Sequence, residues 1–175
     1  MAQSWGNKTY LRKWAKEVRS GLDMETLSLE LVQKLKQTKE YKNAKNIMIF
    51  YPLKDEVNLL SLLDDKTKTL YLPKIDGENL LCCRYGIGEP LCESCFHTKE
   101  PLGVNITEKS LIELVIVPAL AVDKNNYRLG YGGGFYDRFL KNLKAKAIVC
   151  IPNELVVDTV YPEEFDIPVN NVITA

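Results

Sequence analysis

The sequence lacks several features that would point to common classes of function. It has one histidine, His97, to which we assign no general-base role, and no net charge, because 23 Lys and Arg balance 23 Asp and Glu. A chain with balanced charge is a poor candidate for binding nucleic acid through bulk electrostatics. Its longest apolar runs, such as 47–51, are far too short to span a membrane, and residues 1–19 contain no signal-peptide core. We therefore expect a cytoplasmic protein without nucleic-acid or membrane partners.

The chain also lacks internal repeats, low-complexity linkers and any break in composition. Hydrophobic residues make up 46% and charged residues 26%, which excludes bulk disorder and collagen-like structure. A length of 175 residues suits one domain. A chain of this size hides about 70% of its unfolded surface and needs no disulfide or metal for stability. We expect a single domain over residues 1–175.

The five cysteines form no obvious disulfide framework, because their number is odd and Cys82 and Cys83 are adjacent. Cys92 and Cys95 have the spacing of a zinc knuckle, but an adjacent pair is poorly suited to complete such a site. We expect reduced thiols without a function, as is usual in a cytosolic protein.

Two helices are expected near the N-terminus. Over 8–20, Tyr10, Leu11, Trp14 and Val18 recur at helical spacing and predict an apolar stripe. In the next helix, over 24–37, Asp23 is the N-cap and the buried stripe consists of Met24, Leu27, Leu31 and Leu35.

The first of these helices carries a second pattern, a row of cations. Lys8, Arg12, Lys16 and Arg19 fall within one narrow arc. Such an arc is most often a solvated face, although four cations without an interleaved acid slightly favour an anionic partner.

Short apolar runs, several of them closed by proline, alternate with helical segments along the rest of the chain. Strands are expected at 47–51, 69–72, 80–84, 114–117, 147–151 and 172–173, short helices at 59–63 and 135–143, and an irregular loop at 86–105. This alternation predicts an α/β fold with a parallel or mixed sheet and helices on both faces.

A glycine loop is the most informative segment. Gly130, Gly132, Gly133 and Gly134 follow the most apolar strand candidate and precede a helix. Glycines there would let the phosphate oxygens of an anion approach backbone N–H groups. The loop matches neither the P-loop pattern nor G-x-G-x-x-G, because Phe135 stands where the last glycine of that pattern belongs. A flexible surface turn is the alternative.

Two charged residues flank the glycines. Arg128 has the fork of donors that pairs with phosphate. Asp137, in the first turn of the following helix, would either cap that helix or hold Mg²⁺ beside a phosphate, and capping is the simpler interpretation.

The segment from Arg128 to Arg138 resembles the nucleotide and substrate loop of the 5-formyltetrahydrofolate cyclo-ligases, also called methenyltetrahydrofolate synthetases. Further landmarks of that family stand in order, so that the resemblance covers nearly the whole chain. They are Lys8-x-x-Leu11-Arg12, Tyr51 to Asn58, Leu72-Pro73-Lys74, Val117-Pro118-Ala119 and Tyr161 to Pro168.

The resemblance implies a ligase of one-carbon metabolism. Such an enzyme closes 5-formyltetrahydrofolate to 5,10-methenyltetrahydrofolate, with ATP as cosubstrate and Mg²⁺ as cofactor, and we expect a monomer. Arg128 and Tyr136 are then catalytic, and Asp137 and Asp166 hold the metal. The implied ATP-binding residues are Lys8, Arg12, Arg128, Leu129, Gly130, Tyr131, Gly132, Gly133, Gly134, Phe135 and Tyr136. The implied folate-binding residues are Leu53, Glu56, Asn58, Tyr131, Gly132, Gly133, Gly134 and Phe135.

The sequence departs from the family pattern at four single positions, and the segment around Leu102-Gly103-Val104 lacks the Glu-Pro that often follows it. Gly133 and Tyr131 stand where some members have Lys and Arg, Asn58 where an acid is common, and Phe165 in place of a His. Two alternatives are another phosphate-ligand enzyme, such as a sugar-phosphate isomerase, and a non-catalytic nucleotide-binding module.

Overall fold

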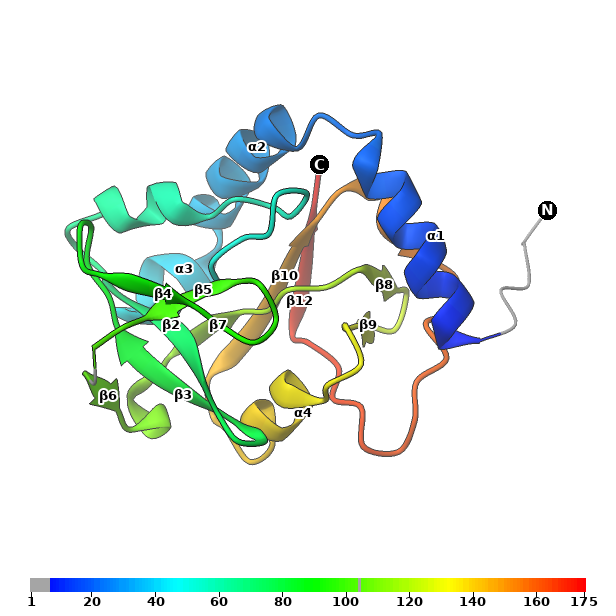
Figure 1. The fold of residues 1–175 in the computed structure, drawn as a ribbon. Helices are drawn as coiled ribbons and strands as arrows, with labels where there is room; N and C mark the ends of the chain where they lie inside the picture. Colours follow the sequence, from blue (N-terminus) through cyan, green and yellow to red (C-terminus); the bar gives the residue numbers. More distant parts are fainter. Residues whose placement is uncertain (1–6, 104) are drawn as a thin grey trace.

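The computed structural model describes residues 7–103 and 105–175 (Figure 1). Its main feature is a seven-stranded sheet in the order β12-β10-β7-β1-β2-β3-β6. The pairs from β12 to β2 are parallel, and β3 and β6 add antiparallel pairs at one edge. The bounds are β1 Asn46–Met48, β2 Thr69–Asp76, β3 Asn79–Arg84, β6 Ile106–Thr107, β7 Leu114–Ile116, β10 Lys146–Ile151 and β12 Asn171–Thr174.

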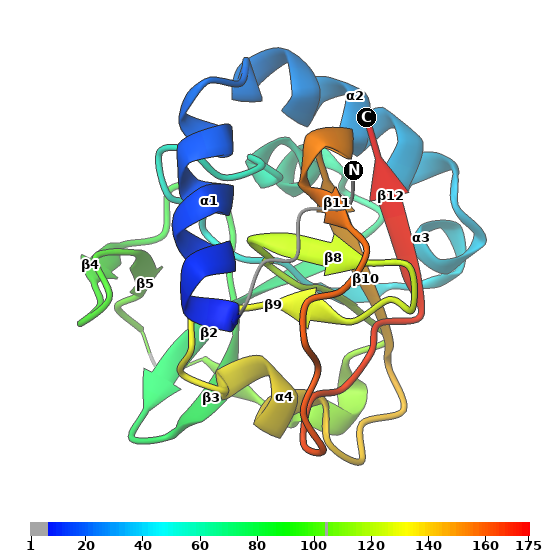
Figure 2. The ribbon, with the colours of Figure 1, turned by 90° about the vertical axis from the view of Figure 1, so that its right-hand side faces the viewer.

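Helices cover both faces of this sheet, because its central strands are apolar on both sides. Met48, Val115 and Val149 belong to one buried cluster, which includes residues of α1 (Lys8–Ser20) and α4 (Phe135–Leu140). The residues that precede and follow them in the same strands belong to a second buried cluster, which includes residues of α2 (Met24–Gln37) and α3 (Lys39–Asn43). The arrangement can be followed in Figure 2. The expected mixed α/β fold is confirmed.

Both N-terminal helices have the expected bounds. Asp23 accepts a hydrogen bond from the Thr26 backbone N–H, as expected of the N-cap of α2. The apolar stripe predicted for α1 is partly wrong, because Tyr10 is 56% exposed and Arg19 only 3% exposed. The buried face of α1 is Leu11, Ala15 and Arg19.

The strand expected at 69–72 does not end at Pro73 but continues to Asp76 as β2. Beyond Tyr71, β2 no longer pairs with β1 and pairs only with β3. Pro73, which has no N–H to donate, is therefore tolerated there. The segment expected to be an irregular loop, 86–105, contains a hairpin of β4 (Leu91–Glu93) and β5 (Lys99–Pro101).

The sequence suggested that the glycine loop directly follows the central strand β7. In the structure it does not. A small sheet intervenes, in the order β11-β8-β9, with β8 at Ala121–Asp123, β9 at Arg128–Leu129 and β11 at Val156–Val157. The buried Asp123 carboxylate accepts hydrogen bonds from the N–H groups of Asn125, Tyr127 and Val160. It thereby fixes the turn before β9 and ties it to the C-terminal segment.

Short 3-10 helices lie at Leu60–Asp64, Lys109–Leu111 and Asn153–Leu155. In the part of the chain that the structure describes, no helix combines the length and the apolar character needed to cross a membrane.

Candidate functional site

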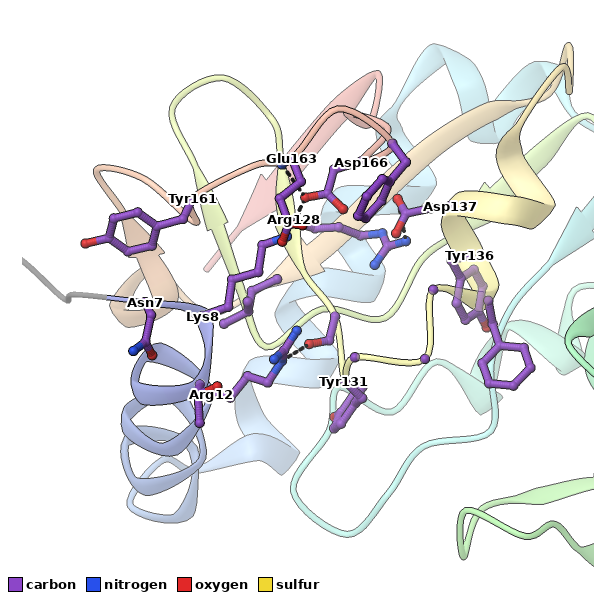
Figure 3. Close-up of a pocket in the computed structure, with 18 residues that line it drawn as sticks. Asn7, Lys8, Arg12, Arg128, Tyr131, Tyr136, Asp137, Tyr161, Glu163 and Asp166 are labelled. Carbon is purple, nitrogen blue, oxygen red and sulfur yellow. Dashed lines mark hydrogen bonds and ion pairs between the residues drawn. The ribbon is translucent and has the colours of Figure 1, made fainter.

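A cavity of about 730 Å³ lies between α1, the glycine loop and the C-terminal segment 161–166 (Figure 3). These three segments are far apart in sequence, and the small sheet and α4 bring them together. The cavity, called here the large pocket, is lined by Asn7, Lys8, Thr9, Arg12, Arg128, Leu129, Gly130, Tyr131, Gly132, Gly133, Gly134, Phe135, Tyr136, Asp137, Tyr161, Glu163, Phe165 and Asp166. It contains every residue for which the sequence implied ATP or metal binding.

The glycine loop has a backbone that side chains would disturb. Gly132 and Gly134 have φ of 105° and 67°, in the left-handed region that favours glycine. A Cβ at Gly133 would lie 2.8 Å from ring carbons of Phe135. The lysine found at this position in some cyclo-ligases therefore does not fit beside Phe135 as the ring lies here.

Two of the four cations in the basic arc of α1, Lys8 and Arg12, line the large pocket, so the arc is not a simple solvated face. Arg12 donates from Nε to the Gly130 carbonyl at 2.9 Å, and Lys8 Nζ lies 2.6 Å from Asp166 and 2.8 Å from Glu163. Burial alone would lower the pKa of Lys8, but hydrogen bonds and charges from the two acids outweigh it and raise that pKa. Lys8 is therefore a cation at neutral pH.

Arg128 is a buried cation with spare donors. Its Nη2 lies 3.3 Å from Asp137 Oδ1, and its guanidinium lies 5.7 Å from the centre of the Tyr136 ring. Neither Nε nor Nη2 makes a hydrogen bond with the described residues. Desolvation lowers the pKa of Arg128, and the Asp137 carboxylate opposes that shift. Unsatisfied donors on a buried charge are costly, which indicates that an anion belongs there.

Asp137 and Asp166 both lie close to the Arg128 side chain (Figure 3). Asp137 accepts a hydrogen bond from the Ile167 N–H and so does not cap its own helix. Partial burial would raise the pKa of Asp166, but hydrogen bonds from Lys8 and from the Glu163 N–H outweigh it and lower that pKa. Each carboxylate has one oxygen without a hydrogen bond among the described residues, and two carboxylates with phosphate oxygens and water suit Mg²⁺.

A second cavity of about 250 Å³, the apolar pocket, lies on the other side of the glycine loop. It shares Tyr131, Gly133, Phe135 and Tyr136 with the large pocket. Its remaining lining is mostly apolar and consists of Phe50, Tyr51, Leu53, Glu56, Pro73, Ile75, Leu80, Phe96, Thr98, Lys99, Glu100 and Pro118. One backbone loop therefore separates a charged cavity from an apolar one.

The β4–β5 hairpin supplies part of the apolar pocket. The Phe96 ring packs edge-on against Phe135 with centroids 5.5 Å apart, and Thr98 Oγ1 donates to the Tyr51 carbonyl at 3.1 Å. The sequence indicated only a loop in this segment, so Phe96 and Thr98 were missed. An isolated aromatic between cysteines and a histidine gave no signal of binding.

Two of the three expected folate residues upstream of the glycine loop line the apolar pocket. Leu53 and Glu56 do so, and Glu56 Oε2 accepts a hydrogen bond from the Leu53 N–H. Asn58 lines neither pocket, because its side chain accepts from the Leu60 N–H in a local turn. The structure does not bring Asn58 to the site.

The cysteines lie away from this chemistry. All five are free, and burial raises the pKa of Cys82 to about 11. Within residues 7–103 and 105–175, no three His, Cys, Asp or Glu side chains converge as metal ligands. His97 lies on the β4–β5 hairpin, contacts Glu93 at 2.9 Å and lines neither pocket.

The chain is similar to known proteins over most of its length. The chain is 31% identical over 147 residues to 5-formyltetrahydrofolate cyclo-ligase of Haemophilus influenzae, covering 77% of this chain and 78% of that protein. It is 30% identical over 142 residues to the Escherichia coli cyclo-ligase, covering 75% and 78%. The NMR structure of Aquifex aeolicus 5,10-methenyltetrahydrofolate synthetase matches with a TM-score of 0.84 and 31% identity, over 95% of this chain and 89% of that one.

A model of the 5-formyltetrahydrofolate cyclo-ligase family matches residues 7–175, which is nearly the whole length. The match includes the basic helix, the glycine loop and the C-terminal segment on which the resemblance was based. The chain therefore belongs to the 5-formyltetrahydrofolate cyclo-ligase family.

Proposed function

We propose that this chain binds ATP in the large pocket and 5-formyltetrahydrofolate in the apolar pocket, and that the reacting groups meet at the glycine loop. The observation that carries this proposal is the shared wall, since Tyr131, Gly133, Phe135 and Tyr136 line both cavities. A cavity that offers three cations and a glycine backbone suits a triphosphate, and a mostly apolar cavity with two carboxylates, Glu56 and Glu100, suits a flat pterin. The enzyme is an ATP-dependent ligase, as its family membership implies.

The reaction joins two steps. The formyl oxygen attacks the γ-phosphorus of ATP, the bond to the β-phosphate oxygen breaks, and ADP leaves. N10 of the folate then attacks the activated formyl carbon and loses its proton, and the carbon–oxygen bond breaks to release phosphate. Such chemistry needs positioning and charge neutralisation more than a protein nucleophile.

The residues around the glycine loop divide these tasks. Arg128 directs the two nitrogens that make no hydrogen bond to the transferred phosphoryl group, and Lys8 and Arg12 neutralise the other phosphates. Burial raises the pKa of Tyr136, so its hydroxyl stays a neutral donor between the pockets. Mg²⁺, held by Asp137 and Asp166, would neutralise phosphate charge when bound.

The test is growth of methenyltetrahydrofolate absorbance in a mixture of protein, ATP, Mg²⁺ and 5-formyltetrahydrofolate. We expect absorbance growth that requires ATP and is matched by equal ADP. Turnover of a sugar phosphate without ATP would favour the isomerase alternative. ATP binding without turnover of either substrate would favour a non-catalytic module.

We also propose that the chain acts as one domain and as a monomer in the cytoplasm, on small-molecule substrates alone. Its balanced charge supports this proposal, because nothing in the composition favours a polyanion. Gel filtration with light scattering would test the monomer.

The metal assignment makes a prediction of its own. Asp137→Asn keeps the hydrogen bond to the Ile167 N–H but removes the negative charge. We expect the Mg²⁺ concentration for half-maximal rate to rise about 10-fold, with binding of 5-formyltetrahydrofolate nearly unchanged. Asp158→Asn is the matched control, because Asp158 is exposed and lines neither pocket. Normal Mg²⁺ dependence in Asp137→Asn would show that this carboxylate does not hold the metal.

A further inference from the structure

A buried arginine stands behind the wall that the two pockets share. Arg19, in the last turn of α1, is 3% exposed and lines neither pocket. Its Nε donates to the Asp55 carbonyl at 2.9 Å, and its Nη2 to the Asp55 carboxylate at 3.2 Å. Burying a charged side chain is unfavourable unless it is paired, so these partners account for its position.

The other contacts of Arg19 reach residues that do line the pockets. Its Nη1 donates to the Tyr131 hydroxyl at 2.8 Å, and its Nη2 lies 3.9 Å from Glu56 Oε1. The Tyr131 hydroxyl in turn donates to Glu56 Oε1. Arg19, Tyr131 and Glu56 therefore form a continuous chain, called here the Arg19 relay, from α1 through the glycine loop to the apolar pocket.

The two pocket residues of this relay depend on Arg19 in different ways. Glu56 is 9% exposed, so the positive charge of Arg19 compensates a carboxylate that has little water around it. Tyr131 is 43% exposed and belongs to the glycine loop, so the hydrogen bonds at its hydroxyl help to fix the ring between the cavities, together with Lys16 Nζ, which lies 6.0 Å from the ring centre. Without Arg19, both the direction of the Glu56 carboxylate and the place of the Tyr131 ring lose support.

We infer that Arg19 is a positioning residue for the folate pocket, which it serves by holding Glu56 and Tyr131 and without touching substrate. The inference rests on the proposed function, because it takes the apolar pocket as the folate site. Arginine suits this task, since its planar fork makes three hydrogen bonds in different directions at once. A lysine at this position would keep the charge but serve fewer partners.

The experiment compares Arg19→Met, Arg19→Lys and Tyr131→Phe in steady-state kinetics with both substrates varied. We expect Arg19→Met and Tyr131→Phe each to raise the KM for 5-formyltetrahydrofolate about 10-fold, and Arg19→Met to change the KM for ATP by less than about 3-fold. Arg19→Lys should recover part of the loss. In the double variant, which combines Arg19→Met with Tyr131→Phe, the two fold-changes in the folate KM should not multiply, because either substitution alone breaks the Arg19 relay.

Two controls separate positioning from general destabilisation. Arg84→Met changes an arginine that is exposed on β3 and lines neither pocket, and we expect unchanged KM values. A structural role alone would lower the melting temperature and the active fraction but leave both KM values as they are. If Arg19→Met fails to fold, Arg19→Lys takes its place in the comparison, and an unchanged folate KM in Tyr131→Phe still overturns the inference.

The outcomes distinguish this inference from the proposed function. An active wild-type enzyme whose folate KM is unaffected by Tyr131→Phe would overturn the inference and leave the function intact. Multiplying effects in the double variant would overturn it as well. An inactive wild-type protein would instead remove the proposed function on which the inference rests.

Discussion

Gly132→Val is expected to lower ATP-dependent turnover by about 100-fold or more. The backbone of Gly132 has φ of 105°, which a β-branched residue adopts only under strain. Its Cβ would also stand 3.6–3.8 Å from the guanidinium carbon and nitrogens of Arg12, in the space where phosphates are proposed to bind. Steady-state kinetics, with circular dichroism to verify folding, would measure the effect.

The matched control for this variant is Gly88→Val. Gly88 has φ of 86°, a Cβ added there would have nothing within 4 Å, and the residue lines neither of the two pockets. Both variants therefore carry a similar backbone strain, and both should lose some stability. Only Gly132→Val should lose activity. A folded Gly132→Val protein with full activity would show that phosphates do not approach this loop.

Arg128→Lys should lower kcat by about 100-fold even though it keeps the positive charge. The buried guanidinium has two nitrogens without a hydrogen bond, and we propose that they bind the transferred phosphoryl group. A lysine offers a point charge and cannot reproduce the planar fork. The change should affect kcat more than the KM for ATP, because the contact strengthens as charge develops in the transition state.

Arg84→Lys makes the same substitution at an exposed position outside the pockets and should leave kcat unchanged. A rise in the KM for ATP with a normal kcat in Arg128→Lys would mean that Arg128 binds the nucleotide without taking part in the chemical step.

Local patterns in the sequence predicted local structure well. The bounds of α1 and α2 and the Asp23 cap could be predicted, because the apolar spacing and the capping residue that define them lie within a few residues of one another in the sequence. The central strands β7 and β10 are apolar on both faces, which made them recognisable as buried. The large pocket could be anticipated because the glycine loop and the basic helix each carry a dense local signal.

What could not be predicted depends on partners far away in the chain. β8 and β9 are two or three residues long and are defined by pairing with each other and with β11. The sequence analysis grouped Arg19 with the other cations of α1, because a charged residue in a helical pattern is normally expected to face solvent. Its burial is stabilised by Asp55 and Tyr131, which lie 36 and 112 residues further on. A sequence pattern within one helix cannot indicate partners that lie so far away in the chain.

The resemblance to a family indicated more residues of the candidate site than sequence spacing did, but not all of them line the pockets. Leu53 and Glu56, which the resemblance implied, line the apolar pocket, whereas the Asn58 side chain accepts a hydrogen bond from the Leu60 N–H in a local turn. Phe96 and Thr98 were missed because the hairpin that presents them has no regular alternation. Their positions follow from the contacts of Phe96 with Phe135 and of Thr98 with Tyr51.

The two apolar clusters on opposite faces of the sheet have a consequence for how this sequence can change over time. No residue of α2 or α3 lines either pocket, and their buried side chains, such as Leu31 and Leu35, pack against one face only. The opposite face includes Leu11, which belongs to the basic helix, and Leu129, which comes directly before the glycine loop. Substitutions in α2 and α3 can therefore change the stability of the protein over time without replacing a residue that lines either pocket.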